Sequence, residues 1–280
     1  MTVEIIRVGA DWLELREPAD AEARSADLAG RLARHLPHSR RRVIHDLGGG
    51  TGSMGRWLAP LLPGPQHWVV HDRDADLLEI AVADLPGRAA DGAAVTVETR
   101  QSDITGLSAA DLAGADLITA SALLDLLTRA DLAGIVALCA RAACPVLLVL
   151  SVVGRVELVP ADPLDARVAA AFDAHQRRMT PRGRLLGPDA VAAAVGEFER
   201  LGAEVVVRPS PWQLGASRGD LAAEWFTGWV DAAFEQEADL PAEAGEYARR
   251  RLAEAAAGRL AVTVGHADIL VMPPGERVPG

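Results

Sequence analysis

The stretch VIHDLGGGTGSMGRWL, from Val43 to Leu58, decides the fold of this chain. A short apolar run contains an acid near its end, Asp46, and leads into a glycine-rich turn and then into sequence with helical character. The glycines of the turn are Gly48, Gly49, Gly50 and Gly52. A strand, a tight glycine turn and a helix form the arrangement by which α/β folds bind a nucleotide-like ligand at the carboxyl end of a strand. The sequence therefore predicts such a site here.

The rest of the chain alternates between predicted strands and helices. Expected strands cover residues 43–47, 66–71, 94–101, 116–120, 145–152, 204–208 and 259–272. Expected helices cover residues 20–36, 53–62, 74–85, the sequence leading to 142, 163–178, 188–201 and most of 219–258. Five strand–helix repeats imply a doubly wound sheet with right-handed crossovers. We therefore expect an α/β fold: a seven-stranded, mostly parallel sheet with an antiparallel last strand, N-terminal helices, and helical insertions after strands five and six.

Composition and charge narrow the classes of partner. The formal charge of −11 is dispersed along the chain, which argues against nucleic acids and acidic membrane surfaces as partners. No secretory signal is visible at the start, and the longest apolar run, 145–153, is too short to span a bilayer. We therefore expect a cytoplasmic protein. Cys139 and Cys144 are the only cysteines, so we expect neither a disulfide framework nor a metal site.

Two residue types are missing from the chain. It has no asparagine and no lysine, so all 28 basic residues are arginines. Without lysine there is no Walker-type phosphate-loop lysine, no Schiff-base nucleophile and no anchor for pyridoxal phosphate. Several nucleotide-dependent enzyme classes are thereby excluded.

Two ligands compete for the glycine loop. Gly50, Gly52 and Gly55 fit the GxGxxG spacing of a dinucleotide site, but that match alone is weak. A pyrophosphate is an anion, and an acid such as Asp46 beside it is unfavourable. S-adenosylmethionine has no phosphate and carries an ammonium and a sulfonium, so the acid suits it, while the glycines let the backbone approach closely.

DLGGGTG resembles the first motif of class I S-adenosylmethionine-dependent methyltransferases, an acid followed by GxGxG. The resemblance covers about residues 43–153 and implies S-adenosylmethionine as cofactor. It also implies that Asp72, at the end of the second strand, binds the ribose hydroxyls, and that Asp103 lies near the adenine amine, with Ile104 against the ring. The cofactor-binding residues it implies are Asp46, Gly48, Gly49, Gly50, Gly52, Asp72, Arg73, Ser102, Asp103, Ile104 and Ser121. Taken singly, Asp72 and Asp103 are as readily helix caps or loop acids.

The resemblance implies one methyltransferase domain, because no repeat or linker divides the chain. Residues 1–40 would form an N-terminal helical lid, 41–153 the cofactor-binding core, and 154–280 the substrate-side helices and the last two strands. The motifs of DNA methyltransferases are missing, so we expect a small-molecule acceptor with an O, N or C nucleophile, methylated by in-line displacement. The alternatives are an NAD(P)-dependent Rossmann oxidoreductase and a homologue that binds the cofactor without catalysis. The sequence leaves open the acceptor, the use of a general base, closure of the lid, and whether the chain is a homodimer.

The sequence offers candidates for catalysis and for acceptor binding. His175 is the preferred general base because the pKa of histidine lies near neutrality, and Asp125 follows the fourth strand at the expected mouth of the site. Expected acceptor-binding residues are Trp12, Arg16, Arg155, Arg178 and Trp212. Each also has a structural reading, as a solvated arginine, a structural histidine or a core tryptophan.

Three further groups have two readings each. Trp12, Arg16 and Arg24 either form a lid over the glycine loop or divide into a core tryptophan and solvated arginines. His266 and Asp268, two residues apart on the last strand, are either a proton-relay pair or an ordinary hydrogen bond at a sheet edge. The aromatic residues at 225, 226 and 229 have helical spacing and either pack in the core or wall an aromatic acceptor.

Overall fold

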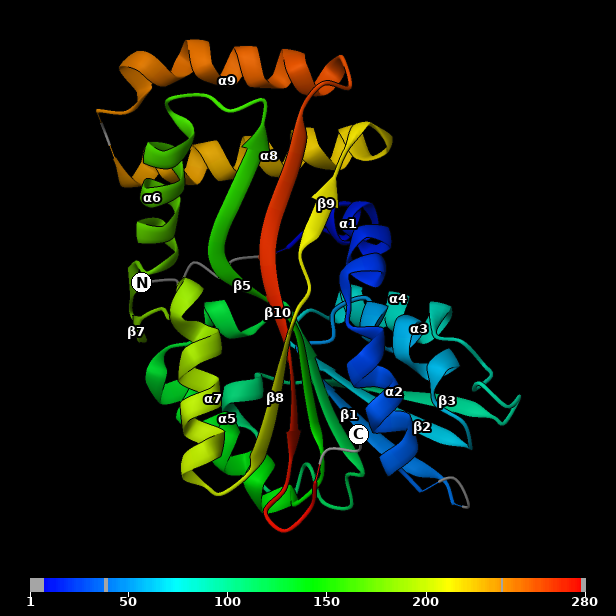
Figure 1. Cartoon of the computed structure of the whole chain (residues 1–280). Helices are drawn as coiled ribbons and strands as arrows, with labels where there is room; N and C mark the ends of the chain where they lie inside the picture. The colour runs from blue at the N-terminus through cyan, green and yellow to red at the C-terminus, as the bar shows by residue number, and fades with distance from the viewer. Residues whose placement is uncertain (1–7, 38–39, 238, 278–280) are drawn as a thin grey trace.

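The core of the protein is one mixed sheet. A computed structural model of the chain describes residues 8–37, 40–237 and 239–277, so residues 1–7 of the expected lid lie outside the described residues. The strand order is β3-β2-β1-β4-β5-β10-β8, in which the first five strands run parallel and β10 is antiparallel to β5 and β8 (Figure 1). The strands are β1 (Arg42–Leu47), β2 (Gln66–Asp72), β3 (Val95–Gln101), β4 (Leu117–Ser121), β5 (Val146–Val159), β8 (Glu204–Pro209) and β10 (Ala261–Met272). The predicted seven-stranded sheet with an antiparallel last strand is confirmed.

Helices cover both faces of this sheet. On one face lie α2 (Ala26–His35), α3 (Ser53–Leu58) and α4 (Ala75–Asp84), and on the other α5 (Arg129–Ala142) and α7 (Ala190–Arg200). Alternate residues of β5 divide between the two faces, with Leu147 and Val149 packing on the α2 side and Val146 and Leu148 on the α5 side. This two-sided burial explains why the first half of β5 is an uninterrupted apolar run.

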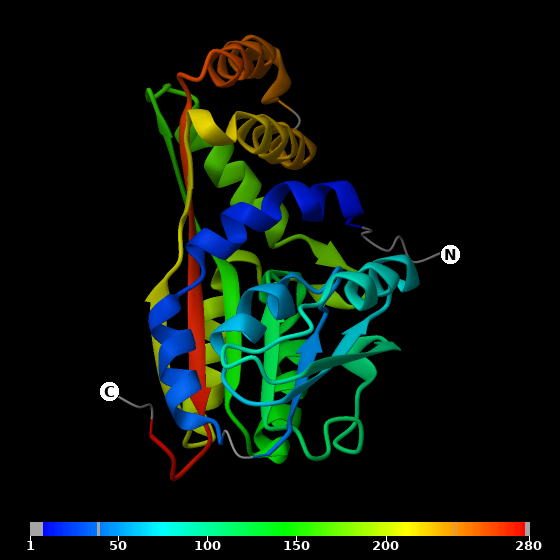
Figure 2. The ribbon, with the colours of Figure 1, turned by 90° about the vertical axis from the view of Figure 1, so that its right-hand side faces the viewer.

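A second layer of the protein lies where β5 and β10 extend beyond the core. It contains α1 (Ala10–Ala23), α6 (Asp165–Gln176), α8 (Gly219–Gln236), α9 (Pro241–Ala256) and the short β9 (Trp212–Leu214), which pairs with β10. We call these elements, with the distal halves of β5 and β10, the cap. Figure 1 shows β5 and β10 running from the core into the cap, and Figure 2 shows α1 crossing between the cap helices and the core.

The expected end of the fifth strand at residue 152 is wrong, because β5 continues to Val159. Residues 146–151 are all buried, whereas burial alternates beyond them. The apolar run therefore marks only the half of the strand that is covered on both faces. The two long strands bend where they leave the core: Leu150 has a φ of 57°, and β10 shows two register shifts between Val264 and Ile269.

The buried carboxylate of Asp268 holds this bend. Its oxygens accept hydrogen bonds from the backbone N–H of Leu150 (2.8 Å), the backbone N–H of Ser25 (2.7 Å) and the hydroxyl of Ser210 (2.6 Å). The reading of His266 and Asp268 as a pair at a sheet edge is therefore wrong, because β10 is an interior strand and Asp268 is used by other partners. The His266 ring packs instead against Trp212, with 5.2 Å between the ring centroids.

Other boundaries also differ from expectation. The single helix expected over 20–36 is two helices, α1 and α2, because Ser25 breaks the run and its hydroxyl caps α2 by accepting from Leu28 N–H. A short hairpin, unpredicted from the sequence, follows α6 and consists of β6 (Met179–Thr180) and β7 (Gly183–Arg184). Short 3-10 helices are η1 (Ala59–Leu61), η2 (Ile104–Gly106), η3 (Leu124–Leu126), η4 (Gly187–Asp189) and η5 (Ala216–Arg218).

Candidate active site

The glycine loop lies tightly on the end of β1. A Cβ atom placed on Gly49 would lie 2.5 Å from Oδ2 of Asp46 and 2.6 Å from Cγ1 of Val70, so no larger residue fits between the loop and the strands. Gly52, directly before α3, has a φ of 83°, a left-handed conformation that favours glycine. The loop therefore presents backbone rather than side chains at the carboxyl end of β1.

Asp46 lies beneath this loop and is fully buried. The Thr119 hydroxyl donates to its Oδ1 at 2.7 Å, while Oδ2 has no hydrogen-bond partner among the described residues. Burial raises the pKa of Asp46 to about 7, although the Thr119 hydrogen bond and the charge of Arg24 act in the opposite direction. A buried carboxylate with an unused oxygen favours a cationic ligand and disfavours a phosphate.

Asp72 ends β2 and holds the loop in place. Its two oxygens accept from the backbone N–H groups of Gly50 and Asp74, each at 2.9 Å. Each carboxylate oxygen has a second lone pair, so Asp72 can still accept hydrogen bonds from ligand hydroxyls. The side chain of the neighbouring Arg73 is exposed, and its backbone carbonyl accepts from the Gln101 amide at 3.1 Å. The roles of Asp72 and Arg73 toward a cofactor stay predictions.

The end of β3 carries Ser102, Asp103 and Ile104. Asp103 caps η2 by accepting from the backbone N–H of Thr105 at 2.9 Å, so the reading as a helix cap applies. Its other oxygen faces Arg182 of the β6–β7 hairpin at 3.3 Å. Ser102 Oγ lies 3.3 Å from Nδ1 of the buried His71. Ser102 and Ile104 are half-buried, and a role of all three beside an adenine ring stays a prediction.

Helix α1 lies directly over the glycine loop. Cδ1 of Leu13 would be 3.5 Å from a Cβ atom on Gly50. Glu17 of α1 accepts from the guanidinium of Arg56 in α3, with 2.6 Å between Nε and Oε1. The N-terminal segment is thus placed where the lid was expected; whether it opens and closes stays a prediction.

Arg24 is the main residue of the site that sequence reasoning left out of its cofactor set. Only 3% exposed, it donates to the Ser53 carbonyl, the Ser53 hydroxyl and the Ser121 hydroxyl, each at 3.0 Å. Its reading as a solvated arginine is therefore wrong. No local signal marks Arg24, because its partners lie 29 and 97 residues away in the sequence. A buried guanidinium between the loop and the end of β4 is suited to a carboxylate ligand.

Asp125 lies on η3, where the charges of two arginines, Arg16 and Arg178, act on it. Burial raises the pKa of Asp125 to about 6, and the charges of Arg16 and Arg178 oppose this rise. No side chain in the described ranges donates a hydrogen bond to it. Arg16 is held by Asp20 on its own helix, at 2.9 Å, and lies over the ring of Trp212 at 4.9 Å from the centroid. Arg16 thus contacts Trp212, which is only 3% exposed and donates from Nε1 to Asp20 at 2.9 Å, and the charges of Arg16 and Arg178 act on Asp125. A role toward an acceptor stays a prediction for these four residues.

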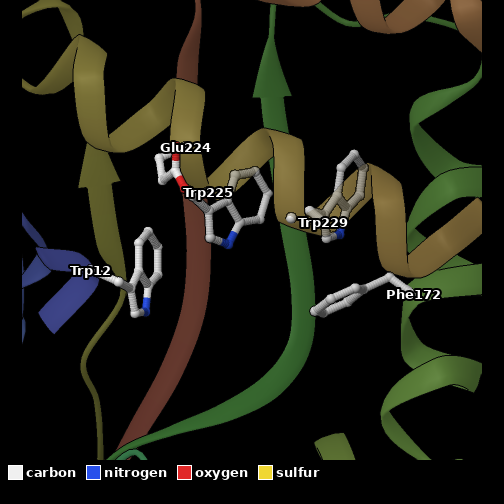
Figure 3. A pocket seen from close by; sticks show the side chains of 6 residues that line it. Trp12, Phe172, Glu224, Trp225 and Trp229 are labelled. Atoms are coloured by element: carbon white, nitrogen blue, oxygen red, sulfur yellow. The ribbon is translucent and has the colours of Figure 1, made fainter. Parts of the chain in front are cut away.

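A cavity of about 250 Å³ lies in the cap between α1, α6 and α8. Its walls are largely aromatic: Trp12, Phe172, Trp225 and Trp229 line it, together with Glu224 and Gly228 (Figure 3). The reading as core residues applies to Phe226 and Trp229, which are buried. Trp225 and Trp229 also line the cavity, and their role toward an aromatic acceptor stays a prediction. Phe172 and Glu224 were not predicted from the sequence.

The arginines whose charges act on Asp125 lie close in sequence to residues that line the cavity. On α1, Trp12 lines the cavity, and Arg16, one turn later, interacts with Asp125. Phe172 belongs to α6, and Arg178 follows directly after that helix. Helix α1 therefore lines the cavity with Trp12 and lies against the glycine loop with Leu13.

His175 and Arg155 have side-chain partners outside this group, although the backbone carbonyl of His175 accepts from Nη1 of Arg178 at 3.2 Å. His175 Nε2 lies 3.1 Å from Oε2 of Glu235 on α8, and the pKa of His175 is lowered, chiefly by burial. Arg155 is 72% exposed and pairs with Glu157 on the distal half of β5. Their roles as a base and in acceptor binding stay predictions, and Asp125 lies on η3 in the segment that follows β4.

Within the described ranges, no group of three or more His, Cys, Asp or Glu side chains is arranged to hold a metal ion. No helix in the same residues is long and apolar enough to cross a membrane.

Comparison with known proteins gives similarity in fold. No family model matches the sequence, and no curated protein matches it. The YcgJ protein from Bacillus subtilis is similar in structure, with 14% identity, a TM-score of 0.50, and coverage of 90% of this chain and 100% of that chain.

Two further solved structures match this chain with lower TM-scores. One, from Geobacter sulfurreducens in complex with S-adenosyl-L-homocysteine, is 15% identical with a TM-score of 0.45, over 96% of this chain and 100% of that chain. The cyclopropane synthase MmaA2 from Mycobacterium tuberculosis is 13% identical with a TM-score of 0.47, over 94% of each chain. At 14% identity, the similarity to the YcgJ protein shows a shared fold alone.

Proposed function

We propose that this chain is an S-adenosylmethionine-dependent methyltransferase that acts on a small-molecule acceptor. One observation carries the proposal: a buried carboxylate, Asp46, lies beneath the glycine loop with an oxygen that no described residue satisfies. An anionic pyrophosphate at this loop would meet that carboxylate and Asp72, whereas a cationic donor would be stabilised by it. The sequence motif and the fold support the same donor.

The residues present fit such a donor. Asp46 would attract its ammonium group, and Arg24 with the Ser121 hydroxyl would bind its carboxylate. Asp72 would accept from the ribose hydroxyls, and Asp103 would lie toward the adenine. When bound, S-adenosylmethionine supplies a methyl group on a sulfonium, which an acceptor lone pair displaces in line.

Asp125 is the residue we assign to proton transfer. An acceptor hydroxyl or amine must lose a proton, and a carboxylate whose pKa is raised to about 6 is a stronger base than an ordinary aspartate while remaining ionised at neutral pH. Arg16 and Arg178 stabilise the ionised form of Asp125. The aromatic walls of the cavity would keep water from the acceptor, and α1 would position it against the loop.

Calorimetry tests the donor. We expect S-adenosylhomocysteine to bind and NADH not to bind, and we expect Asp72→Ala to weaken S-adenosylhomocysteine binding. Asp84→Asn, at an exposed position of α4, is a matched control that should leave binding unchanged. Binding of NADH instead of S-adenosylhomocysteine would refute the proposal. Donor binding without methyl transfer to any compound of a broad panel, followed with a labelled donor, would refute the enzymatic part.

A further inference from the structure

The charges around the aromatic cavity do not cancel. Arg16 is paired with Asp20, and the charges of Arg16 and Arg178 both act on Asp125, so an acid offsets the charge of each of these arginines. Glu224 at the cavity has no ion pair or hydrogen bond with any described residue, which leaves one uncompensated negative charge at the wall. The cavity is therefore suited to a ligand with positive charge.

The aromatic side chains add to the same preference. Three indoles and one phenyl ring line the cavity, and the faces of aromatic rings, indole most of all, attract cations. Trp225 and Trp229 are stacked with 5.3 Å between their ring centroids, and Phe172 lies 6.4 Å from Trp229. Several rings from different helices around one small space form the type of cage that recognises substituted ammonium groups.

The wall also contains an unused donor. Nε1 of Trp229 is buried and has no hydrogen-bond partner among the described residues. Figure 3 shows the nitrogen edges of Trp12, Trp225 and Trp229 turned to the same side of the cavity, the side from which β5 rises out of the core. An oxygen of a ligand in the cavity would satisfy such a donor, which a purely apolar filling would leave unpaired.

We propose that this cavity binds a small organic cation, an alkylated or protonated amine that forms one end of the methyl acceptor. That the cation is part of the methyl acceptor rests on the proposed function. That the cavity prefers a cation does not depend on the proposed function. The volume of about 250 Å³ suits a ligand with few heavy atoms. The acceptor would extend from Glu224 and the indoles toward Asp125 and the glycine loop.

Two probes of the same shape separate charge from fit. Choline carries a quaternary ammonium, and 3,3-dimethylbutan-1-ol replaces its nitrogen by carbon, so the two differ mainly in charge. Their binding to the whole protein would be measured by quenching of tryptophan fluorescence and by calorimetry, with S-adenosylhomocysteine at saturation. We expect choline to bind at least tenfold more tightly than the neutral alcohol.

Two variants of α8 test whether the preference for choline depends on the cavity. Glu224→Gln should weaken choline binding about fivefold and leave the neutral alcohol unaffected, whereas Asp231→Asn, also exposed on α8 but outside the cavity, should change neither. Equal binding of the two probes, no binding of choline, or unchanged choline affinity in Glu224→Gln would overturn the inference. Binding of S-adenosylhomocysteine alone is measured on the same samples. Its absence would overturn the proposed function while a choline preference still established the cation site.

Discussion

Replacement of Asp46 by asparagine should stabilise the cofactor-free protein at alkaline pH while weakening donor binding. The carboxylate is fully buried, and one of its oxygens has no partner among the described residues, so its ionised form is costly in the folded state. The Thr119 hydroxyl can donate to the asparagine carbonyl as it does to Oδ1 of Asp46. The substitution therefore removes the charge and keeps the shape and one hydrogen bond.

The magnitude follows from the pKa of Asp46. Its rise from 3.8 to about 7, at about 1.36 kcal/mol per pKa unit, makes the ionised form cost about 4 kcal/mol in the folded state. Below the pKa that Asp46 has in the unfolded chain, its carboxyl group is protonated in both the folded and the unfolded state, so it does not lower the free energy of unfolding. As the pH rises, the unfolded chain ionises first, so stability falls until the pH passes the folded value. Between about pH 5.5 and about pH 8.5 the wild type should lose about 2 kcal/mol that the variant does not lose.

Urea unfolding followed by tryptophan fluorescence at the two pH values provides the measurement. The difference in unfolding free energy between variant and wild type should shift by about 2 kcal/mol in favour of the variant at the higher pH. The unpaired asparagine N–H₂ has a cost of its own, about 1–3 kcal/mol, but that cost does not change with pH. An exposed control, Asp84→Asn, should show no such shift. A difference independent of pH would refute the argument that Asp46 is held as a costly buried carboxylate.

Four further predictions concern the site. Asp125→Asn should lower kcat about 10²–10⁴-fold at unchanged S-adenosylhomocysteine affinity, and it should abolish the rise of the wild-type rate as the pH passes about 6. Initial rates with a labelled donor report both effects. A pH profile of the variant like that of the wild type would count against Asp125 as the base. His175→Gln should change kcat much less, and an equal loss would transfer the role to His175. Arg24→Met should weaken S-adenosylhomocysteine binding by about tenfold or more, since a charge-assisted hydrogen bond contributes about 1.5–3 kcal/mol. If calorimetry shows wild-type affinity for the variant, the role of Arg24 toward the donor carboxylate is refuted. Gly49→Ala should lower Tm and remove donor binding, because its Cβ would lie 2.5 Å from Oδ2 of Asp46; an unchanged thermal transition would contradict this packing.

Some of the fold could be predicted from the sequence because it depends on neighbours along the chain. The run from Val43 to Leu47 and the glycines after it specify a strand and a tight turn by local chemistry. The apolar run at 145–152 similarly marks a strand buried on both faces. Periodicity could not predict the distal half of β5, because alternating residues there pair with β10 in the cap. It could not predict β9 either, whose three residues pair with β10 about fifty positions later.

In the candidate site, too, some features follow from the sequence and others only from the tertiary structure. The sequence alone determined the acid-and-glycine motif and the placement of Asp72 and Asp103 at successive strand ends, because parallel strands bring their carboxyl ends to one edge of a sheet. Only the tertiary structure decided that Arg24 is buried against Ser121, that the charges of Arg16 and Arg178 act on Asp125, and that Trp12 lines an aromatic cavity with α6 and α8. These contacts join residues that are far apart in the chain. They depend on how the helices pack on bent strands, and no local sequence pattern encodes that packing.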